Sequence, residues 1–230
     1  MAKTETVETK LGQGHSPEGN SDGKSRCPWA AGQGDEQSRA RMRLYHDREW
    51  GVPLHDERRH FEFLLLETFQ AGLSWQCILN RREGFRAAFA AFDPVRVAVF
   101  GRNDVERLLQ DSGIIRNRSK IEGTIQNARC FLEVQQQWGN FDAYIWHFTE
   151  GKSLQNSWRE AGQVPVSSPL AEKVAGDLKQ RGFCRVGAVT IYAHLQAIGV
   201  IQDHLQSCFR YRDLAETQGS VLRSPSSSLS

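Results

Sequence analysis

The chain has 230 residues, 39% of them hydrophobic, and its 29 basic and 27 acidic residues leave a formal net charge of +2 at pH 7. This length suffices for one well-buried domain, or for two small ones that share a core, and the charge balance excludes a uniformly basic nucleic-acid binder. Five cysteines, an odd number in a chain that shows no secretory signal, argue against a disulfide framework.

The two ends of the chain differ in composition from the middle. Residues 1–25 and 211–230 are poor in large apolar side chains, which predicts disordered tails around a folded domain at 26–210. The N-terminal segment lacks the apolar core of a signal peptide, and no apolar stretch is long enough to span a membrane. We therefore expect a cytoplasmic, monomeric protein.

Between the tails, the apolar residues are spaced as in helices. Helix starts are expected at Asp93-Pro94, at Asn103 with a capping-box partner in Glu106, and at Ser168-Pro169. A further helical pattern runs from Thr190 to His204, and convincing strand alternation is absent. The only long non-helical stretch is about 150–167. These patterns predict an all-α fold.

Glu67 is the only charged residue between Phe63 and Leu79. A carboxylate in such an apolar segment is expected to be buried, and an unpaired buried charge costs several kcal/mol, on the order of the whole folding margin. Two interpretations follow. Glu67 either has an internal partner, such as an arginine or backbone amides, or it is held in a pocket for a ligand that donates hydrogen bonds or carries positive charge.

Several large aromatic residues lie in the segments on either side of Glu67. They are Trp29, Tyr45, Trp50 and Trp75. Aromatic faces attract cations, so these rings could form a stacking pocket for a flat, electron-poor ring around the carboxylate. The alternative is that each one is an ordinary core aromatic.

A basic helical hairpin is predicted at about 103–132. Its turn surrounds Gly113 and is followed at once by Arg116, Arg118 and Lys120. A tight turn that leaves free helix amides beside three cations is suited to binding DNA phosphates and resembles a helix-hairpin-helix element. An ordinary hairpin with a solvated basic face is the alternative.

His204 and Cys208 are four residues apart in a segment expected to be helical, which would place both side chains on one face. Cys27 and His46 could complete a Cys2His2 metal site, although other histidines compete for the role: His55, His60, His147 and His194. Four protein ligands would leave no open position, so such a metal would be structural. The remaining cysteines are expected to fill the core.

Six segments, in order over residues 26–208, are similar to motifs of the 3-methyladenine DNA glycosylase I family. They are Cys27-Pro-Trp29, Tyr45-His-Asp-Arg-Glu-Trp-Gly-Val-Pro53, Glu67-Thr-Phe-Gln-Ala-Gly-Leu-Ser-Trp75, Asp111-Ser-Gly-Ile-Ile-Arg116, Arg181-Gly-Phe-Cys-Arg-Val-Gly187 and Asp203-His-Leu-Gln-Ser-Cys208. The resemblance implies a monofunctional base-excision-repair enzyme of the helix-hairpin-helix superfamily that acts on alkylated adenine in double-stranded DNA. It also implies one structural Zn²⁺ that joins the N-terminal arm to the C-terminal helix.

The resemblance implies a role for each matching residue. The zinc ligands would be Cys27, His46, His204 and Cys208. Glu67 would hold the edge of the flipped base, with Trp29, Tyr45 and Trp75 as pocket aromatics. Gly72 and Leu73 would fill the gap that the flipped base leaves in the duplex. Two departures from the family pattern are Pro28, where glycine is expected, and the pair Thr68-Phe69 after the glutamate.

Alkylation at N3 gives adenine a formal positive charge, so the base can leave without being protonated first. The expected enzyme therefore needs base flipping, aromatic stacking and one carboxylate. Glu67 either only recognises the base or also activates the attacking water. Two other classes of protein are open: a non-catalytic reader of damaged DNA, and a zinc-stabilised interaction module with an incidental basic hairpin. Release of a base separates all three.

Overall fold

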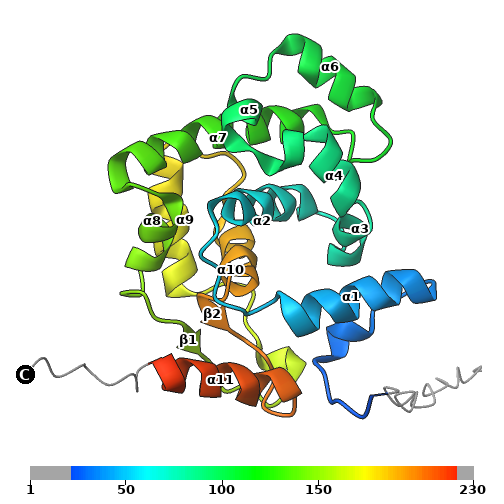
Figure 1. Cartoon of the computed structure of the whole chain (residues 1–230), viewed down its shortest axis with the longest axis vertical. Helices are drawn as coiled ribbons and strands as arrows, with labels where there is room; N and C mark the ends of the chain where they lie inside the picture. The colour runs from blue at the N-terminus through cyan, green and yellow to red at the C-terminus, as the bar shows by residue number, and fades with distance from the viewer. Residues whose placement is uncertain (1–21, 222–230) are drawn as a thin grey trace, which may run out of the picture.

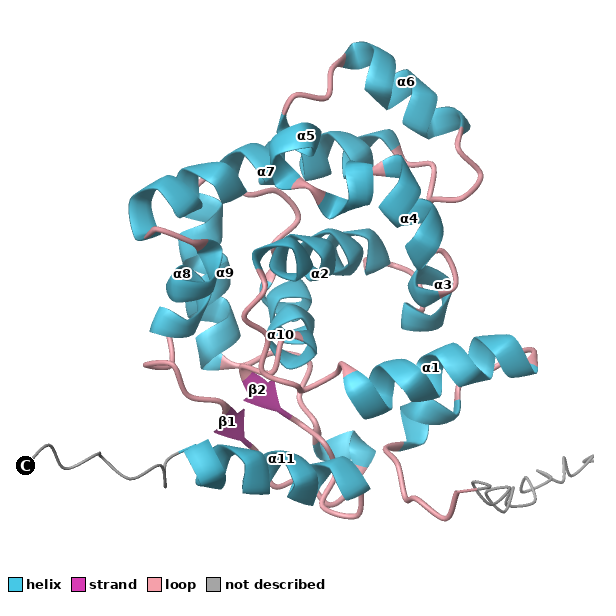
Figure 2. Cartoon of the chain, viewed as in Figure 1, coloured by secondary structure: helices cyan, strands magenta, loops and turns pink. Residues whose placement is uncertain are grey.

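The computed structural model describes the backbone of residues 22–221 and the side chains of residues 22–216. This part of the chain is mostly helical (Figures 1 and 2). The α-helices are α1 (Glu36–Arg48), α2 (Glu57–Gln70), α3 (Trp75–Leu79), α4 (Arg82–Ala88), α5 (Pro94–Ala98), α6 (Arg102–Gln110), α7 (Arg118–Trp138), α8 (Phe141–His147), α9 (Pro169–Gln180), α10 (Ala188–Ala197) and α11 (Phe209–Val221). Short 3₁₀ helices are η1 (Pro28–Ala31), η2 (Ala90–Phe92) and η3 (Ala161–Gln163).

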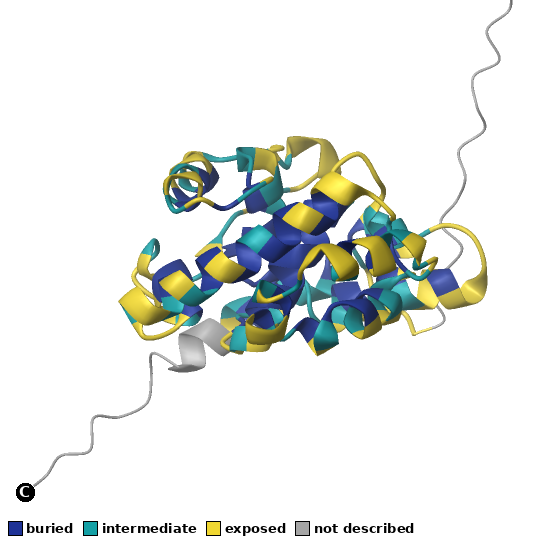
Figure 3. Ribbon diagram, turned by 90° about the horizontal axis from the view of Figure 1, so that it is seen from above, coloured by how far each residue is buried: buried dark blue, intermediate teal, exposed yellow. Residues whose placement is uncertain are grey.

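Helix α2 is the centre of the fold. Every residue from His60 to Phe69 is buried, because α7, α8 and α10 pack around this helix (Figure 1). The helix begins at an N-cap, Asp56, whose side chain accepts a hydrogen bond from the amide of Arg59. Buried residues gather in the middle of the molecule and exposed ones lie around its outline (Figure 3). A helix covered on all sides holds its side chains rigidly, which suits it to carry a site.

The helix starts expected at two proline-containing caps are confirmed. Asp93 caps α5 and Ser168 caps α9, each through a side chain that accepts backbone amide hydrogen bonds. The expected capping box at Asn103 is wrong. Helix α6 begins earlier, with Gly101 as N-cap, and the carboxylate of Asp104 accepts from the Gly101 amide at 3.1 Å. The acidic residue that caps the helix is therefore Asp104.

The helical pattern expected up to His204 ends sooner. Helix α10 stops at Ala197, and the chain then passes through Gly199, whose φ is +75° and where a Cβ would lie 2.5 Å from the Pro53 nitrogen. This close approach requires glycine and turns the chain away from the helix axis. The next residues form β2 (Ile201–Gln202), which pairs in parallel with β1 (Leu154–Gln155) in the otherwise helical fold (Figure 2).

The chain is helical past residue 211, where a disordered tail was expected to begin. Helix α11 covers residues 209–221, and its Leu214 is buried against the domain. The amide of Phe209 also donates to the carbonyl of Ser25 at 2.9 Å, which joins the two ends of the described chain. Residues 1–21 and 222–230, which belong to the predicted tails at 1–25 and 211–230, lie outside the described residues. No helix within residues 22–221 is long and apolar enough to cross a membrane.

Candidate functional site

A cavity of about 490 Å³ is lined by residues of α2 and α3 and by residues of α1 and η1. Figure 1 shows where these helices lie in the fold. Helix α10 contributes Ala193 and Gln196 to its wall. The other residues that line it are Pro28, Trp29, Ala31, Gly32, Gln33, Met42, Tyr45, Trp50, Glu67, Gln70, Ser74, Trp75 and Gln76. A concave, mostly apolar space with a few polar groups is the usual form of a small-molecule site.

Glu67 lies in the last turn of α2 and lines this cavity. Its side chain is buried, and its Oε2 has no hydrogen-bond partner in the part of the chain that the structure describes. Burial raises the pKa of Glu67 to about 8. Glu62 on the same helix is equally buried, but its Oε1 accepts from Nε of Arg82 at 2.8 Å. Glu62 therefore has an internal arginine partner. For Glu67, the sequence left open an internal partner or a ligand pocket, and the structure places it at a cavity.

The predicted aromatic residues all line the cavity. The ring centroids of Tyr45 and Trp75 are 5.1 Å apart, and those of Trp29 and Trp50 are 4.9 Å apart. The indole Nε1 of Trp75 is buried without a partner among the described residues. Burial and the nearby charge of Glu67 raise the pKa of Tyr45. The residues that line the cavity therefore combine aromatic rings with an indole N–H and a carboxylate oxygen that have no partner among the described residues.

A short turn follows α2 at the rim of the cavity. Gln70 and Ser74 line the cavity, and the turn between them contains Gly72, with φ of +81°, and Leu73, which is 38% exposed. The amide of Leu73 donates to the carbonyl of Gln70 at 2.6 Å, which closes the turn. An exposed leucine is thus held on a tight turn beside the cavity mouth.

The hairpin predicted at 103–132 consists of α6 and α7 joined by residues 111–117. Its turn packs closely on α4, since a Cβ at Gly84 would lie 2.2 Å from the Gly113 carbonyl oxygen. Arg116 is exposed and has no ionic or hydrogen-bond partner among the described residues. Arg118 is paired with Glu106 at 2.9 Å. The N-terminus of α7 is capped by the side chain of Asn117.

Lys120 differs from the two arginines because it is buried. Its Nζ donates to the carbonyls of Phe69 and Ala71, both at 2.7 Å. These carbonyls belong to the C-terminal end of α2, next to the rim turn. The hairpin and the rim turn are therefore linked by one ammonium group.

A second helical hairpin, formed by α9 and α10, lies beside the first. Its turn contains Arg185, which is exposed and donates from Nη2 to Oγ of Ser119 at 2.6 Å. Gly187 precedes α10 and has no side chain to cap the helix. The first amides of α10 therefore receive no hydrogen bond from an N-cap side chain. No role was predicted for this turn from the sequence. Its signal is the pattern of glycines and arginines over residues 181–187.

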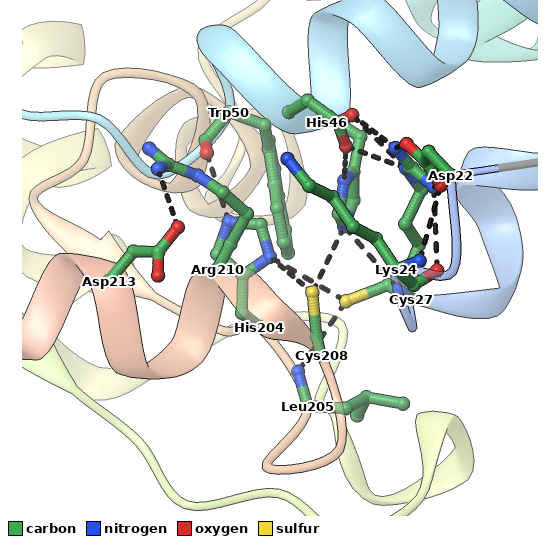
Figure 4. A network of polar contacts seen from close by, with 12 residues as sticks. Asp22, Lys24, Cys27, His46, Trp50, His204, Leu205, Cys208, Arg210 and Asp213 are labelled. Atoms are coloured by element: carbon green, nitrogen blue, oxygen red, sulfur yellow. Dashed lines mark hydrogen bonds and ion pairs between the residues drawn. The ribbon is translucent and has the colours of Figure 1, made fainter.

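The four predicted metal ligands form one buried cluster (Figure 4). Their ligand atoms all lie within 4.8 Å of one another. The Sγ of Cys208 is 3.4 Å from Nε2 of His46 and 3.5 Å from Nδ1 of His204, and the Sγ of Cys27 is 3.7 Å from the latter. This buried Cys2His2 cluster could hold a metal ion, and it joins the N-terminal arm to the segment before α11.

The outer nitrogens of both histidines are engaged by acceptors. Nδ1 of His46 bonds to the carboxylate of Asp47 at 2.8 Å, and Nε2 of His204 to the carbonyl of Trp50 at 3.1 Å. Each outer nitrogen must carry the proton, so each inner nitrogen presents its lone pair to the thiols. This is the tautomer that a metal ligand requires.

One part of the sequence argument for the cluster is wrong. His204 and Cys208 do not share a helix face, because residues 203–208 form an irregular segment between β2 and α11. The competing histidines lie elsewhere, and two of them share an acceptor: Nε2 of His60 is 2.9 Å and Nδ1 of His55 is 3.0 Å from Asp142. The loop, and not a helical repeat, brings the two ligands together.

The chain matches the family model of methyladenine glycosylase over residues 35–211. It is 42% identical to the DNA-3-methyladenine glycosylase 1 of Escherichia coli (strain K12) over 167 residues, which cover 73% of this chain and 89% of that protein. The Haemophilus influenzae DNA-3-methyladenine glycosylase is 38% identical over 184 residues, 80% of this chain and 96% of that protein. A solved structure on 3-methyladenine recognition by the Staphylococcus aureus 3-methyladenine DNA glycosylase I superposes with a TM-score of 0.74 at 34% identity, over 78% of this chain and 94% of that one.

The chain belongs to the methyladenine glycosylase family. The resemblance seen in the sequence and the fold expected from it are thereby confirmed.

The two departures from the family pattern can be placed within this glycosylase fold. Pro28 is the first residue of η1 and lines the cavity next to Trp29. Thr68 and Phe69 do not line the cavity: the hydroxyl of Thr68 donates to the Leu65 carbonyl at 2.8 Å, and Phe69 packs on Phe85 at a centroid distance of 4.7 Å. Of the two departures, only Pro28 borders the cavity.

Proposed function

We propose that the chain is a monofunctional DNA-3-methyladenine glycosylase of base-excision repair. The observation that carries this proposal is Oε2 of Glu67, a buried acceptor that has no partner among the described residues and belongs to a residue that lines an aromatic cavity. The names of the E. coli and H. influenzae relatives support it, as does a solved 3-methyladenine DNA glycosylase I, 33% identical, that was crystallised with 3-methyladenine.

The chemistry of the cavity fits an alkylated base. In DNA, adenine methylated at N3 is cationic and flat, so it can stack on Trp75 and Tyr45 while its exocyclic amine donates to Glu67. A cation beside Glu67 favours the carboxylate form and so lowers the raised pKa of this residue. Unmodified adenine is neutral and does not supply that compensation. The site therefore selects the charged base.

The reaction that follows is a hydrolysis. DNA binds across the face that carries Arg116 and Arg185, the damaged nucleotide rotates into the cavity, and Leu73 enters the duplex beside it. The bond between C1′ and N9 breaks, and its electron pair neutralises the cationic ring. Water adds to C1′ and loses a proton, and 3-methyladenine leaves as a neutral base. Ionised Glu67 stabilises the positive charge on the sugar and base as the bond breaks.

Among the described residues, no amine lines the cavity that could replace water as the nucleophile. Among the described residues that line it, none is a lysine. A lyase step requires an amine that attacks C1′. This composition supports the monofunctional assignment.

The buried Cys2His2 cluster is proposed to bind one Zn²⁺. Two thiolates and two imidazoles with inward lone pairs are the donor set of a closed tetrahedral zinc site. With four protein ligands the ion has a structural function: it ties Cys27 to the segment that contains His204 and Cys208. Trp29 lies next to this cluster, with its ring centroid 5.1 Å from that of His46. The metal thus supports one wall of the cavity.

The test is to incubate the protein with methylated duplex DNA and to separate the released bases by chromatography. The proposal predicts 3-methyladenine among the products. DNA binding without a released base would instead indicate a reader of damaged DNA. If the protein shows no base release and no salt-dependent DNA binding, the result would indicate an interaction module.

A further inference from the structure

Lys120 is the buried member of the basic series in the first hairpin. It lies in the first turn of α7, and its Nζ bonds to the carbonyls of Phe69 and Ala71. Arg116 is exposed, whereas the side chain of Lys120 is buried and reaches the end of α2. Burial and the nearby Arg185 lower the pKa of Lys120. An ammonium with two of its three hydrogens on carbonyls, and little exposed surface, is poorly placed for a phosphate.

The two carbonyls that Lys120 binds lie at the end of α2. The last carbonyls of a helix lack intrahelical partners and carry the negative end of the helix dipole, so a cation there is stabilising. Ala71 is the C-cap of α2, and Gly72 and Leu73 follow directly. The position of the exposed Leu73 therefore depends on the same bonds that end the helix.

We infer that Lys120 is a positioning residue that fixes the Gly72–Leu73 turn for entry into the duplex. This inference rests on the proposed function and assigns Lys120 a different role from that of Arg116. Arg116 binds phosphate from the surface of the hairpin. Lys120 acts from inside it, and connects the helix that follows the hairpin turn to the turn that replaces the flipped base.

The substitution Lys120→Met keeps most of the side-chain volume and removes the ammonium. The measurement is the single-turnover release of 3-methyladenine from one methylated oligonucleotide, used alone and annealed to its complement. We expect release from the duplex to fall about 10-fold or more, since each hydrogen bond to a charged group is typically worth a factor of that order. Release from the single strand should change little, because it has no gap for Leu73 to fill.

Arg116→Met is the matched comparison. Loss of one phosphate contact reduces the slope of log Kd against log salt by about one. Arg116→Met is expected to show this reduction, and Lys120→Met is expected to keep the wild-type slope. If Lys120→Met also lowers the slope by about one, Lys120 is a phosphate contact and the inference fails.

Leu73→Ala provides a double-mutant cycle that does not depend on the salt measurement. If Lys120 acts through Leu73, Lys120→Met should have little further effect in the Leu73→Ala protein. Additive losses would contradict the inference, as would equal losses on duplex and single strand. Circular dichroism checks the fold, and Lys120→Gln, which keeps an N–H donor, replaces Lys120→Met if that protein is unfolded. If the wild-type protein releases no base, the proposed function fails together with this inference. If the wild type releases the base and Lys120→Met releases it from the duplex at the same rate, only this inference fails.

Discussion

Nδ1 of His46 lies 2.8 Å from the carboxylate of Asp47, its neighbour in the sequence. The carboxylate fixes the proton on this nitrogen and leaves Nε2 free to bind a metal. Asp47→Asn should weaken zinc binding about 10- to 100-fold, the usual effect of removing such an outer partner. Competition with a chromophoric chelator measures the affinity for zinc. Asp142→Asn is the control, because Asp142 also accepts from histidines but lies outside the cluster; equal weakening in both variants would contradict the assignment.

Removal of the metal should loosen the N-terminal arm. Zinc binding contributes directly to folding in closed Cys2His2 sites, so a chelator or Cys27→Ser should lower the melting temperature and weaken binding of free 3-methyladenine through Trp29. Cys130→Ser, at a buried thiol that does not belong to the cluster, should retain both the metal and base binding. Metal analysis with calorimetry tests this. A stably folded protein that never contains metal would contradict the zinc proposal.

Glu67 should reduce stability at neutral and alkaline pH. Its pKa rises from 4.5 in the unfolded chain to about 8 in the empty fold, so the folded state retains a proton that the unfolded state loses between these values. Stability is therefore lost as pH rises through this window. Glu67→Gln should raise the free energy of unfolding at pH 8 by about a few kcal/mol, and by little at pH 4.

Glu62 supplies the opposite expectation on the same helix. Its buried carboxylate is paired with the part-buried Arg82 and Arg86, so Glu62→Gln removes two ionic contacts and should destabilise the protein by roughly 1–3 kcal/mol. Urea unfolding of both variants at pH 5 and pH 8 provides the comparison. Two variants that are destabilised alike would show that Glu67 has a partner after all.

Trp75 should contribute to binding of the free base. Stacking on one aromatic ring is worth about 1–3 kcal/mol per base, so Trp75→Ala should raise the Kd for 3-methyladenine about 10-fold or more. Isothermal titration calorimetry measures the change. Trp138→Ala, which removes an indole packed on Tyr144 away from the cavity, is the control. An unchanged affinity in Trp75→Ala would remove Trp75 from the pocket.

Local signals in the sequence predicted much of the fold. Proline next to a capping side chain marks α5 and α9, because both effects act within one turn of helix. The cluster of Cys27, His46, His204 and Cys208 was expected from its residue types and the family pattern. Its geometry was not, because a loop and not a helix presents the last two ligands.

Tertiary partners explain what the sequence could not show. Arg118 and Lys120 carry the same charge and belong to one basic segment of the sequence. In the fold, however, Arg118 pairs with Glu106, and Lys120 is buried against the end of α2. The difference depends on which elements pack against the start of α7, and side-chain periodicity does not contain that information. Likewise, Glu62 and Glu67 lie on one helix, and only the fold shows which of them has an arginine partner.

The most direct test of this account is the release of 3-methyladenine from methylated duplex DNA by the wild-type protein and by Glu67→Gln under single-turnover conditions. The account predicts release by the wild type and a rate about 100-fold lower in the variant. A decrease of this size is typical when one group that stabilises charge in the transition state is removed. A folded Glu67→Gln protein with the wild-type rate, or a wild-type protein that releases no base, would contradict it.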